Sequence, residues 1–224
     1  MDYRHELKHR VNMADYALLR NRLKHLMAPD PHGDENGTYT VRSLYFDNLR
    51  DKALQEKLDG VDRREKFRLR CYNGDEGFIR LEKKTKCKGL SSKYSARLSR
   101  AEAEAIIACD WERIRRIETP LVRELYAKMQ SEQLRPRTLV QYQREAYLYP
   151  AGNVRVTFDT ALKTGLFSTG LLDPNTPLVT PGEPVALLEV KYDEFIPEHL
   201  VRLLQLGDRR AGAFSKYAAC RVYG

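Results

Sequence analysis

Apolar and charged residues alternate along several short segments of the chain, a pattern typical of β-strands with one buried side. In LLEVKYD (187–193), Glu189 and Lys191 fall on one side of such a strand, while Leu188 and Val190 fall on the other. The same period of two recurs in YRHELKHRV, EKFRLRCY, FIRLEKKTK and NVRVTFDT. The segment VQYQREAY differs, because Arg144 shares its side with apolar residues. The pattern predicts five strands that each carry a charged side opposite an apolar side.

Helical spacing and capping signals interrupt this succession of strands. Apolar residues recur at helical spacing in 14–27, and Ser99 with Glu102 has the spacing of a capping box. A further helix is expected across 117–133, with a boundary or kink at Pro120, and another opens at Pro197. The segment 166–184 is rich in Gly, Pro and Thr, and strands are expected on both sides of it. We therefore expect a long loop within a single α+β domain that spans residues 1–224.

The charged sides of the strands have two interpretations. An antiparallel sheet often has one solvated side, and for any one strand this is the ordinary expectation. Here, however, arginine and lysine dominate the charged sides, and clustered cations repel one another unless an anion compensates. The second interpretation is an antiparallel β-barrel with a charged interior and helices packed outside. Such an interior would bind phosphate chains, and its glutamates would hold Mg²⁺ or Mn²⁺.

The overall composition narrows the class of partner. The 224 residues include 39 basic and 31 acidic ones, a formal net charge of +8, and the pI is near 9.3, which favours polyanionic partners. A nucleic-acid interface would interleave aromatic residues with the cations, and Tyr142 alone has that position near the middle of a strand, so we expect no nucleic acid. The four cysteines form no CxxC pair, and the chain shows neither a signal peptide nor an apolar membrane span. These features predict a cytoplasmic protein.

Nine short motifs resemble those of one protein family and occur in its order along almost the whole chain. The chain resembles the polyphosphate polymerase (VTC) domain of the triphosphate tunnel metalloenzyme superfamily. The motifs are ELK (6–8), SLYFD (43–47), FRLR (67–70), LEKKT (81–85), SSK (91–93), YQREAY (142–147), VRVTFD (154–159), LEVK (188–191) and FSKY (214–217).

The resemblance implies a set of site residues. Cations of the family tunnel correspond to Lys8, Arg68, Arg70, Lys84 and Lys93 for substrate binding, and to Arg144, Arg155, Lys191 and Lys216 for catalysis. The metal ligands correspond to Glu189 and Glu6. Glu6 and Lys8 match the end of the ExExK signature of related tunnel enzymes, whereas Arg4 stands where its first glutamate would be.

The function implied by the resemblance is phosphoryl transfer that depends on Mn²⁺ or Mg²⁺. The expected reaction is synthesis of polyphosphate from ATP, so ATP or another triphosphate and polyphosphate are the expected partners. Two alternatives stay open, namely an inorganic or nucleoside triphosphatase and a polyphosphate-binding module without turnover. A partner protein in a membrane also stays open.

Overall fold

The computed structural model describes residues 5–88, 90–183, 185–205, 212 and 214–223, so Arg4 lies outside the described residues. The strands are β1 (His5–Val11), β2 (Ala28–Pro29), β3 (Thr38–Asp47), β4 (Arg64–Tyr72), β5 (Ile79–Cys87), β6 (Leu90–Leu98), β7 (Arg135–Tyr149), β8 (Val154–Thr164) and β9 (Ala186–Tyr192). The helices are α1 (Met13–Lys24), α2 (Lys52–Leu58), α3 (Arg100–Ala108), α4 (Trp111–Arg115), α5 (Pro120–Ser131), α6 (Glu198–Leu204) and α7 (Lys216–Tyr223), with a short 3₁₀ turn η1 (Ala151–Asn153).

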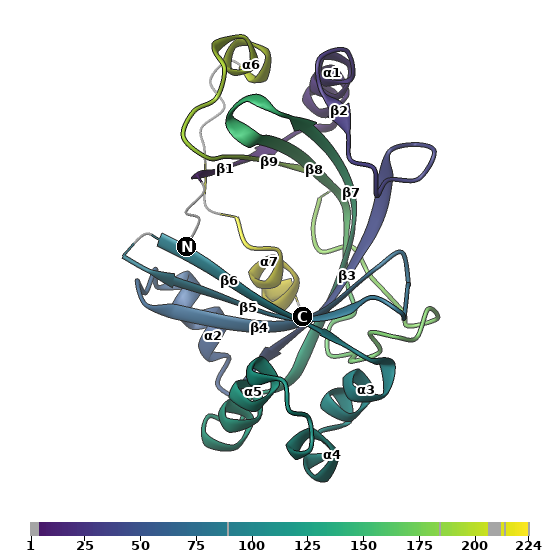
Figure 1. The fold of residues 1–224 in the computed structure, drawn as a ribbon, viewed down its shortest axis with the longest axis vertical. Helices are drawn as coiled ribbons and strands as arrows, with labels where there is room; N and C mark the ends of the chain where they lie inside the picture. Colours follow the sequence, from purple (N-terminus) through teal and green to yellow (C-terminus); the bar gives the residue numbers. More distant parts are fainter. Residues whose placement is uncertain (1–4, 89, 184, 206–211, 213, 224) are drawn as a thin grey trace. The chain divides into compact units, whose positions relative to one another are not determined.

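The hydrogen-bonded strands follow the order β1-β9-β8-β7-β3-β4-β5-β6, and β2 pairs with β7 (Figure 1). All of the described strand pairs in this order are antiparallel, namely β1 with β9, β9 with β8, β3 with β4, β4 with β5 and β5 with β6. The predicted α+β class with an antiparallel sheet is therefore confirmed. Among the described residues, no backbone pairing joins β1 to β6 at the two ends of this order.

The chain divides into two compact units. Unit 1 comprises 1–40, 142–162 and 182–215, and unit 2 comprises 41–141, 163–181 and 216–224. Strands β3, β7 and β8 contribute residues to both units. The single domain expected from the sequence stays a prediction.

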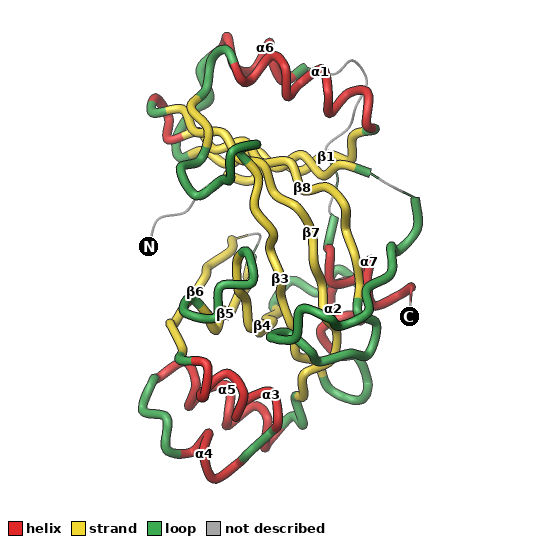
Figure 2. The backbone as a smooth tube through the Cα atoms, turned by 90° about the vertical axis from the view of Figure 1, so that its right-hand side faces the viewer, coloured by secondary structure: helices red, strands yellow, loops and turns green. Residues whose placement is uncertain are grey.

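In unit 1, helices α1 and α6 cover the apolar side of the strands. Leu19 and Leu23 from α1 and Leu200 from α6 pack with Phe158 of β8 and Val190 of β9 in one buried cluster. The two helices lie side by side (Figure 2). Helix α1 begins after Asn12, whose side chain accepts a hydrogen bond from the Asp15 amide at 2.7 Å. The apolar phase of these strands is thus buried, as the alternation predicts.

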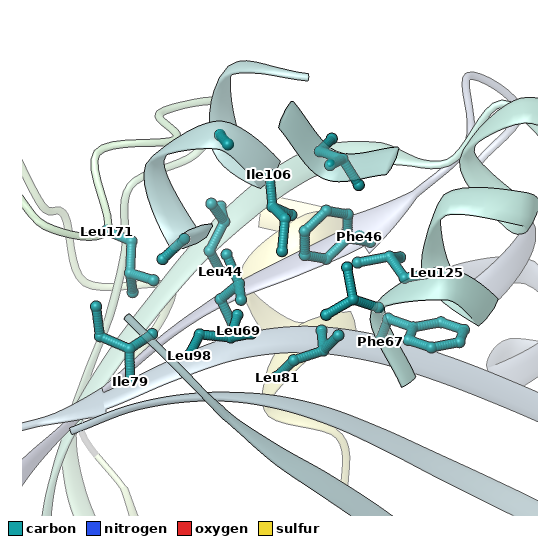
Figure 3. Packing of buried hydrophobic residues seen from close by; sticks show 14 of the residues in the cluster. Leu44, Phe46, Phe67, Leu69, Ile79, Leu81, Leu98, Ile106, Leu125 and Leu171 are labelled. Carbon is teal, nitrogen blue, oxygen red and sulfur yellow. The ribbon is translucent and has the colours of Figure 1, made fainter. Parts of the chain in front are cut away.

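In unit 2, the apolar side of the strands packs against α3 and α5. Figure 3 shows Leu44, Phe67 and Leu81, from three strands, packed with Ile106 of α3 and Leu125 of α5. All five side chains are almost fully inaccessible to solvent. Burial of a large apolar side chain contributes about 1.5–3 kcal/mol, so this cluster fixes which side of each strand faces the helices. The residues between the apolar ones must then lie on the opposite side.

Local signals located some helices well and missed others. The Ser99–Glu102 capping box is present at the start of α3, and Pro120 is the first residue of α5. The helix expected over 14–27 is observed as α1 and ends earlier, at Lys24. The segment 166–184 contains no helix or named strand among its described residues, as expected for a loop. Helices α2, α4 and α7 were not expected, because each has at most eight residues and too few turns to show a clear period.

Candidate functional sites

Cations lie side by side on neighbouring strands of unit 2. The register places Lys66, Lys84 and Lys93 opposite one another on β4, β5 and β6; we call these three the lysine row. Four residues further along β4, Arg70, Arg80 and Arg97 lie opposite one another in the same way and form the arginine row. Like charges directly opposite one another destabilise a sheet, so two such rows on one side indicate an anionic ligand.

Glu82 lies between the two rows. It is opposite Arg68 on β4, and its side chain is only 2% exposed. Arg68 donates from Nε to Oε2 of Glu82 at 2.8 Å, and Nη1 of Arg70 lies 3.7 Å from the same oxygen. Lys93 forms an ion pair with Oε1. Burial alone would raise the pKa of Glu82, but the charges of Arg68, Arg70 and Lys93 lower it to about 2. Glu82 is therefore ionised at neutral pH and holds these cations in place.

Tyr45 supports Arg68 from the neighbouring strand β3. The Arg68 Nη1 group donates to the Tyr45 hydroxyl at 2.8 Å, and the side chain of Tyr45 is almost fully buried. Burial would raise the pKa of this hydroxyl, but the charges of Arg68, Lys66 and Arg70 lower it to about 7. The three cations therefore make the electrostatic potential at the Tyr45 hydroxyl positive.

Glu189 lies at the centre of a second charged cluster, in unit 1. On β1 and β9, Lys8 is opposite Glu189 and Glu6 is opposite Lys191, while Arg155 on β8 is also opposite Lys191. Nζ of Lys191 lies 2.7 Å from Oε1 of Glu189, and Nζ of Lys8 lies 2.9 Å from Oε1 of Glu6. The sequence prediction that these charged residues share one side is borne out by this register.

The electrostatic surroundings keep Glu189 ionised. Burial would raise its pKa, but a side-chain hydrogen bond with Glu6 and the charges of Lys191, Lys8 and Arg144 hold the pKa far below the usual range. Glu189 is therefore suited to bind cations. At neutral pH its carboxylate carries no proton, so it would not act as a general acid.

Arg144 and Arg155 each use part of their hydrogen-bonding capacity on an aspartate of unit 1. Arg144 donates from Nε and Nη2 to Asp159 at 2.6 and 2.8 Å. Arg155 donates from Nη2 to Asp30 at 2.6 Å and to the Tyr39 hydroxyl at 3.0 Å. The contact with Asp159 places the Arg144 guanidinium with the charged residues, which explains how the one strand that broke the sequence pattern still contributes to the cluster.

Lys216 is the first residue of α7, and a pair of polar contacts fixes this helix within unit 2. The Tyr217 hydroxyl donates to Asp47 Oδ2 at 2.5 Å, and Arg221 makes two hydrogen bonds of 3.0 Å with Asp51. Asp47 also accepts hydrogen bonds from two backbone amides at the start of α2. The sequence motif FSKY thus contains a buried anchor, Tyr217, directly after the candidate cation.

The predicted site residues fall into two groups. Around Glu189 the structure brings together Glu6, Lys8, Arg144 and Lys191, with Arg155 opposite Lys191. Around Glu82 it brings together Arg68, Arg70 and Lys93, with Lys84 opposite Lys93 in the lysine row, while Lys216 begins α7.

Sequence reasoning gave no role to Tyr45, and it counted Glu82 only among the glutamates of the charged sides that would hold a metal, without naming it as a ligand. Both lie within motifs that carry the resemblance, LEKKT and SLYFD, and Glu82 is in the charged phase of its strand. The motifs therefore pointed to both positions, whereas the side chains that Glu82 and Tyr45 contact could be identified only from the structure.

The predicted ligands of Mn²⁺ or Mg²⁺ are the carboxylates of Glu189 and Glu6. No group of three or more His, Cys, Asp or Glu side chains suited to a metal occurs in the part of the chain that the structure describes. Glu189 and Glu6 nevertheless offer two neighbouring carboxylates, and the lysine ammonium groups lie against these oxygens as a metal cation would. Mg²⁺ commonly needs only one or two protein carboxylates when phosphate oxygens complete its shell. The pair fits such an ion.

Comparisons with known proteins agree with the family suggested by the motifs. The family model described as "VTC domain" matches residues 3–223. A comparison with curated proteins found no match.

Three solved structures from Pyrococcus are similar to this chain. The PH1819 protein from Pyrococcus horikoshii OT3 has 12% identity over 90% of this chain and 84% of its own, with a TM-score of 0.43. The PH1012 protein from the same organism has 14% identity over 93% and 92%, with a TM-score of 0.42. A conserved hypothetical protein, Pfu-838710-001 from Pyrococcus furiosus, has 11% identity over 92% of each chain, with a TM-score of 0.44.

In the described part of the chain, no helix is both long enough and apolar enough to span a lipid bilayer.

Proposed function

This chain belongs to the VTC domain family, and we propose that it carries out metal-dependent phosphoryl transfer on linear phosphate chains, making polyphosphate from ATP. The observation that supports this most directly is the pair of cation rows in unit 2. The lysine row, Arg68 and the arginine row contain seven cations, and Glu82 is the carboxylate among them at the registered positions. This excess of positive charge on one side of a sheet is suited to a linear polyanion.

The cations of unit 2 would bind successive phosphates of the chain. Arg68 and Arg70 are well prepared for this, because Glu82, Tyr45 and Ser43 already fix their guanidinium groups. A side chain that is held in its binding geometry loses little conformational entropy when the ligand arrives. Charge-assisted hydrogen bonds from arginine to phosphate are among the strong ones in proteins.

The residues around Glu189 would serve the reacting phosphates. Glu189 and Glu6 would hold the divalent ion, which when bound supplies charge neutralisation to phosphate oxygens. Arg144, Arg155 and Lys191 would donate hydrogen bonds to the oxygens of the transferred group. Lys216, which begins α7 in unit 2, is proposed as a further catalytic cation. Phosphoryl transfer needs mostly positioning and neutralisation of this kind.

In the proposed reaction, a terminal oxygen of a phosphate chain attacks the γ-phosphorus of ATP. The bond from that phosphorus to the β,γ-bridging oxygen breaks, and ADP leaves with the bonding electrons. The attacking oxygen is already ionised near neutral pH, so no side chain is required to remove a proton. Hydrolysis would differ only in that water attacks, and it would release free phosphate.

The test is to incubate the protein with ATP and Mn²⁺ or Mg²⁺ and to separate the products. Polymer together with ADP is the expected result. Replacing Glu189 by Gln should abolish turnover with either metal while tripolyphosphate still binds, because the arginines remain. Glu198→Gln, on the exposed surface of α6 in the same unit, is the matched control and should be active.

Three outcomes would contradict the proposal or the role of Glu189 in it. Free phosphate without polymer would make the protein a triphosphatase, and tripolyphosphate binding without any turnover would make it a binding module. Full turnover by Glu189→Gln would remove this carboxylate from the mechanism.

A further inference from the structure

Two aromatic residues continue the charged side of unit 2 beyond the arginine row. Tyr72 lies two residues after Arg70 at the end of β4, and Phe78 lies two residues before Arg80, next to the start of β5. Alternate residues of a strand share a side, so Tyr72 falls in the phase of the β4 cations. Phe78 precedes β5 and lies beside Tyr72. The hairpin turn between β4 and β5 joins them, and their ring centroids are 6.0 Å apart.

Arginines lie against these rings. The Arg80 guanidinium is 4.6 Å from the centroid of Phe78 and that of Arg97 is 5.7 Å from it, while Arg70 lies 5.9 Å from the centroid of Tyr72. Both rings are only partly buried, unlike the aromatic residues of the core. The planes of the two rings are inclined by 50°, so they are not stacked on each other. Guanidinium groups thus lie over both rings, and each of the two residues keeps part of its surface exposed.

From these contacts we propose that Tyr72 and Phe78 form a subsite that stacks the nucleobase of a nucleoside triphosphate whose phosphates lie along the cation rows. This inference rests on the proposed function and adds the direction in which the nucleotide binds. Tyr72 lies four positions after Arg68, which is about 13 Å along a strand. A triphosphate with its ribose has a comparable length. The base would lie at the β4–β5 hairpin, and the γ-phosphate would point toward the lysine row.

Stacking of this kind tolerates different bases, because each base has a π-face. Purines offer the larger face, so ATP and GTP should bind more tightly than CTP and UTP. The subsite also explains why aromatic residues stand at the end of the cationic side, since a linear polyphosphate by itself would have no use for them.

The experiment compares ATP with inorganic tripolyphosphate by titration calorimetry at one salt concentration, using the full chain. Replacement of both Tyr72 and Phe78 by Leu should weaken ATP binding roughly five- to a hundredfold, the range expected for one stacked base. Tripolyphosphate binding should change less than twofold. The matched control is Phe167→Leu, which removes another ring of the same unit that lies between two arginines, Arg137 and Arg221, and should leave both affinities unchanged.

A second measurement covers the case in which the double variant does not fold. The fluorescence of 2-aminopurine riboside triphosphate should be quenched on binding to the unmodified protein, because the base stacks on a ring, and Phe78→Leu alone should reduce the quenching.

The results separate this inference from the proposed function. If the unmodified protein binds tripolyphosphate and the aromatic variants lose ATP and tripolyphosphate affinity equally, the rings only support the arginines and the subsite does not exist. Absence of quenching would also overturn it. If the unmodified protein does not bind tripolyphosphate at all, the proposed function itself fails.

Discussion

Glu82→Gln tests whether the cations of unit 2 bind a phosphate chain. The substitution preserves the shape of the side chain and removes the negative charge that lies between the lysine and arginine rows. The pKa of Glu82 falls from 4.5 to about 2 on folding, and 1.36 kcal/mol per pKa unit gives about 3 kcal/mol of stabilisation at neutral pH. Removing one partner of a buried ion pair commonly costs a similar amount, about 3–5 kcal/mol.

The dependence on pH has a definite sign. Because the pKa of Glu82 is lower in the folded state, its contribution is fully present above pH 4.5 and is lost as the pH falls toward 2. The stability difference between the unmodified protein and Glu82→Gln should therefore shrink from about 3 kcal/mol at pH 7 to about 1 kcal/mol at pH 3.

Thermal unfolding with and without tripolyphosphate is the assay. At pH 7 the variant should unfold about 6–12 °C lower than the unmodified protein. Tripolyphosphate should raise its midpoint more than that of the unmodified protein, because the ligand replaces the missing charge. Glu124→Gln is the control, since it removes a partly exposed partner of Lys83 and should cost about 0–1 kcal/mol. An unchanged midpoint, or an equal effect of tripolyphosphate on both proteins, would refute the reasoning.

Three further predictions follow from the same contacts. Tripolyphosphate binding should weaken as the pH rises through 7, because the ionised Tyr45 hydroxyl competes with the ligand for the cations. Calorimetry at pH 6 and pH 8 should show this loss of affinity for the unmodified protein and no such loss for Tyr45→Phe. Tyr217→Phe should lower the free energy of unfolding by about 1–3 kcal/mol in a denaturant titration, since Asp47 loses a buried hydrogen bond; an unchanged midpoint would contradict this. Replacing Arg68 and Arg70 together by Ala should weaken tripolyphosphate binding at least about a hundredfold in titration calorimetry, and normal binding would place the anion elsewhere.

The order of residues along the chain is enough to assign the charged side of the five strands that alternate regularly. Strand side chains alternate with a period of two, so Arg68 and Arg70 must lie opposite Phe67 and Leu69 wherever the strand is placed. The buried apolar clusters confirm this alternation in both units. The capping box at Ser99 was equally readable, because all of its atoms belong to one short segment. The family was also readable from short motifs, because nine of them occur in order over almost the whole chain.

Which charges meet depends on the folded chain. Alternation within a strand does not determine the register between strands. A shift of one residue in the register would move every side chain of that strand to the opposite side of the sheet. Register alone places Arg70, Arg80 and Arg97 opposite one another, and only the folded chain shows that Glu82 holds Arg68. The partner of Arg144 also required the folded chain, because Asp159 lies on the neighbouring strand β8. Local sequence fixes the direction of a side chain, whereas its partner depends on pairings set by the core and the turns.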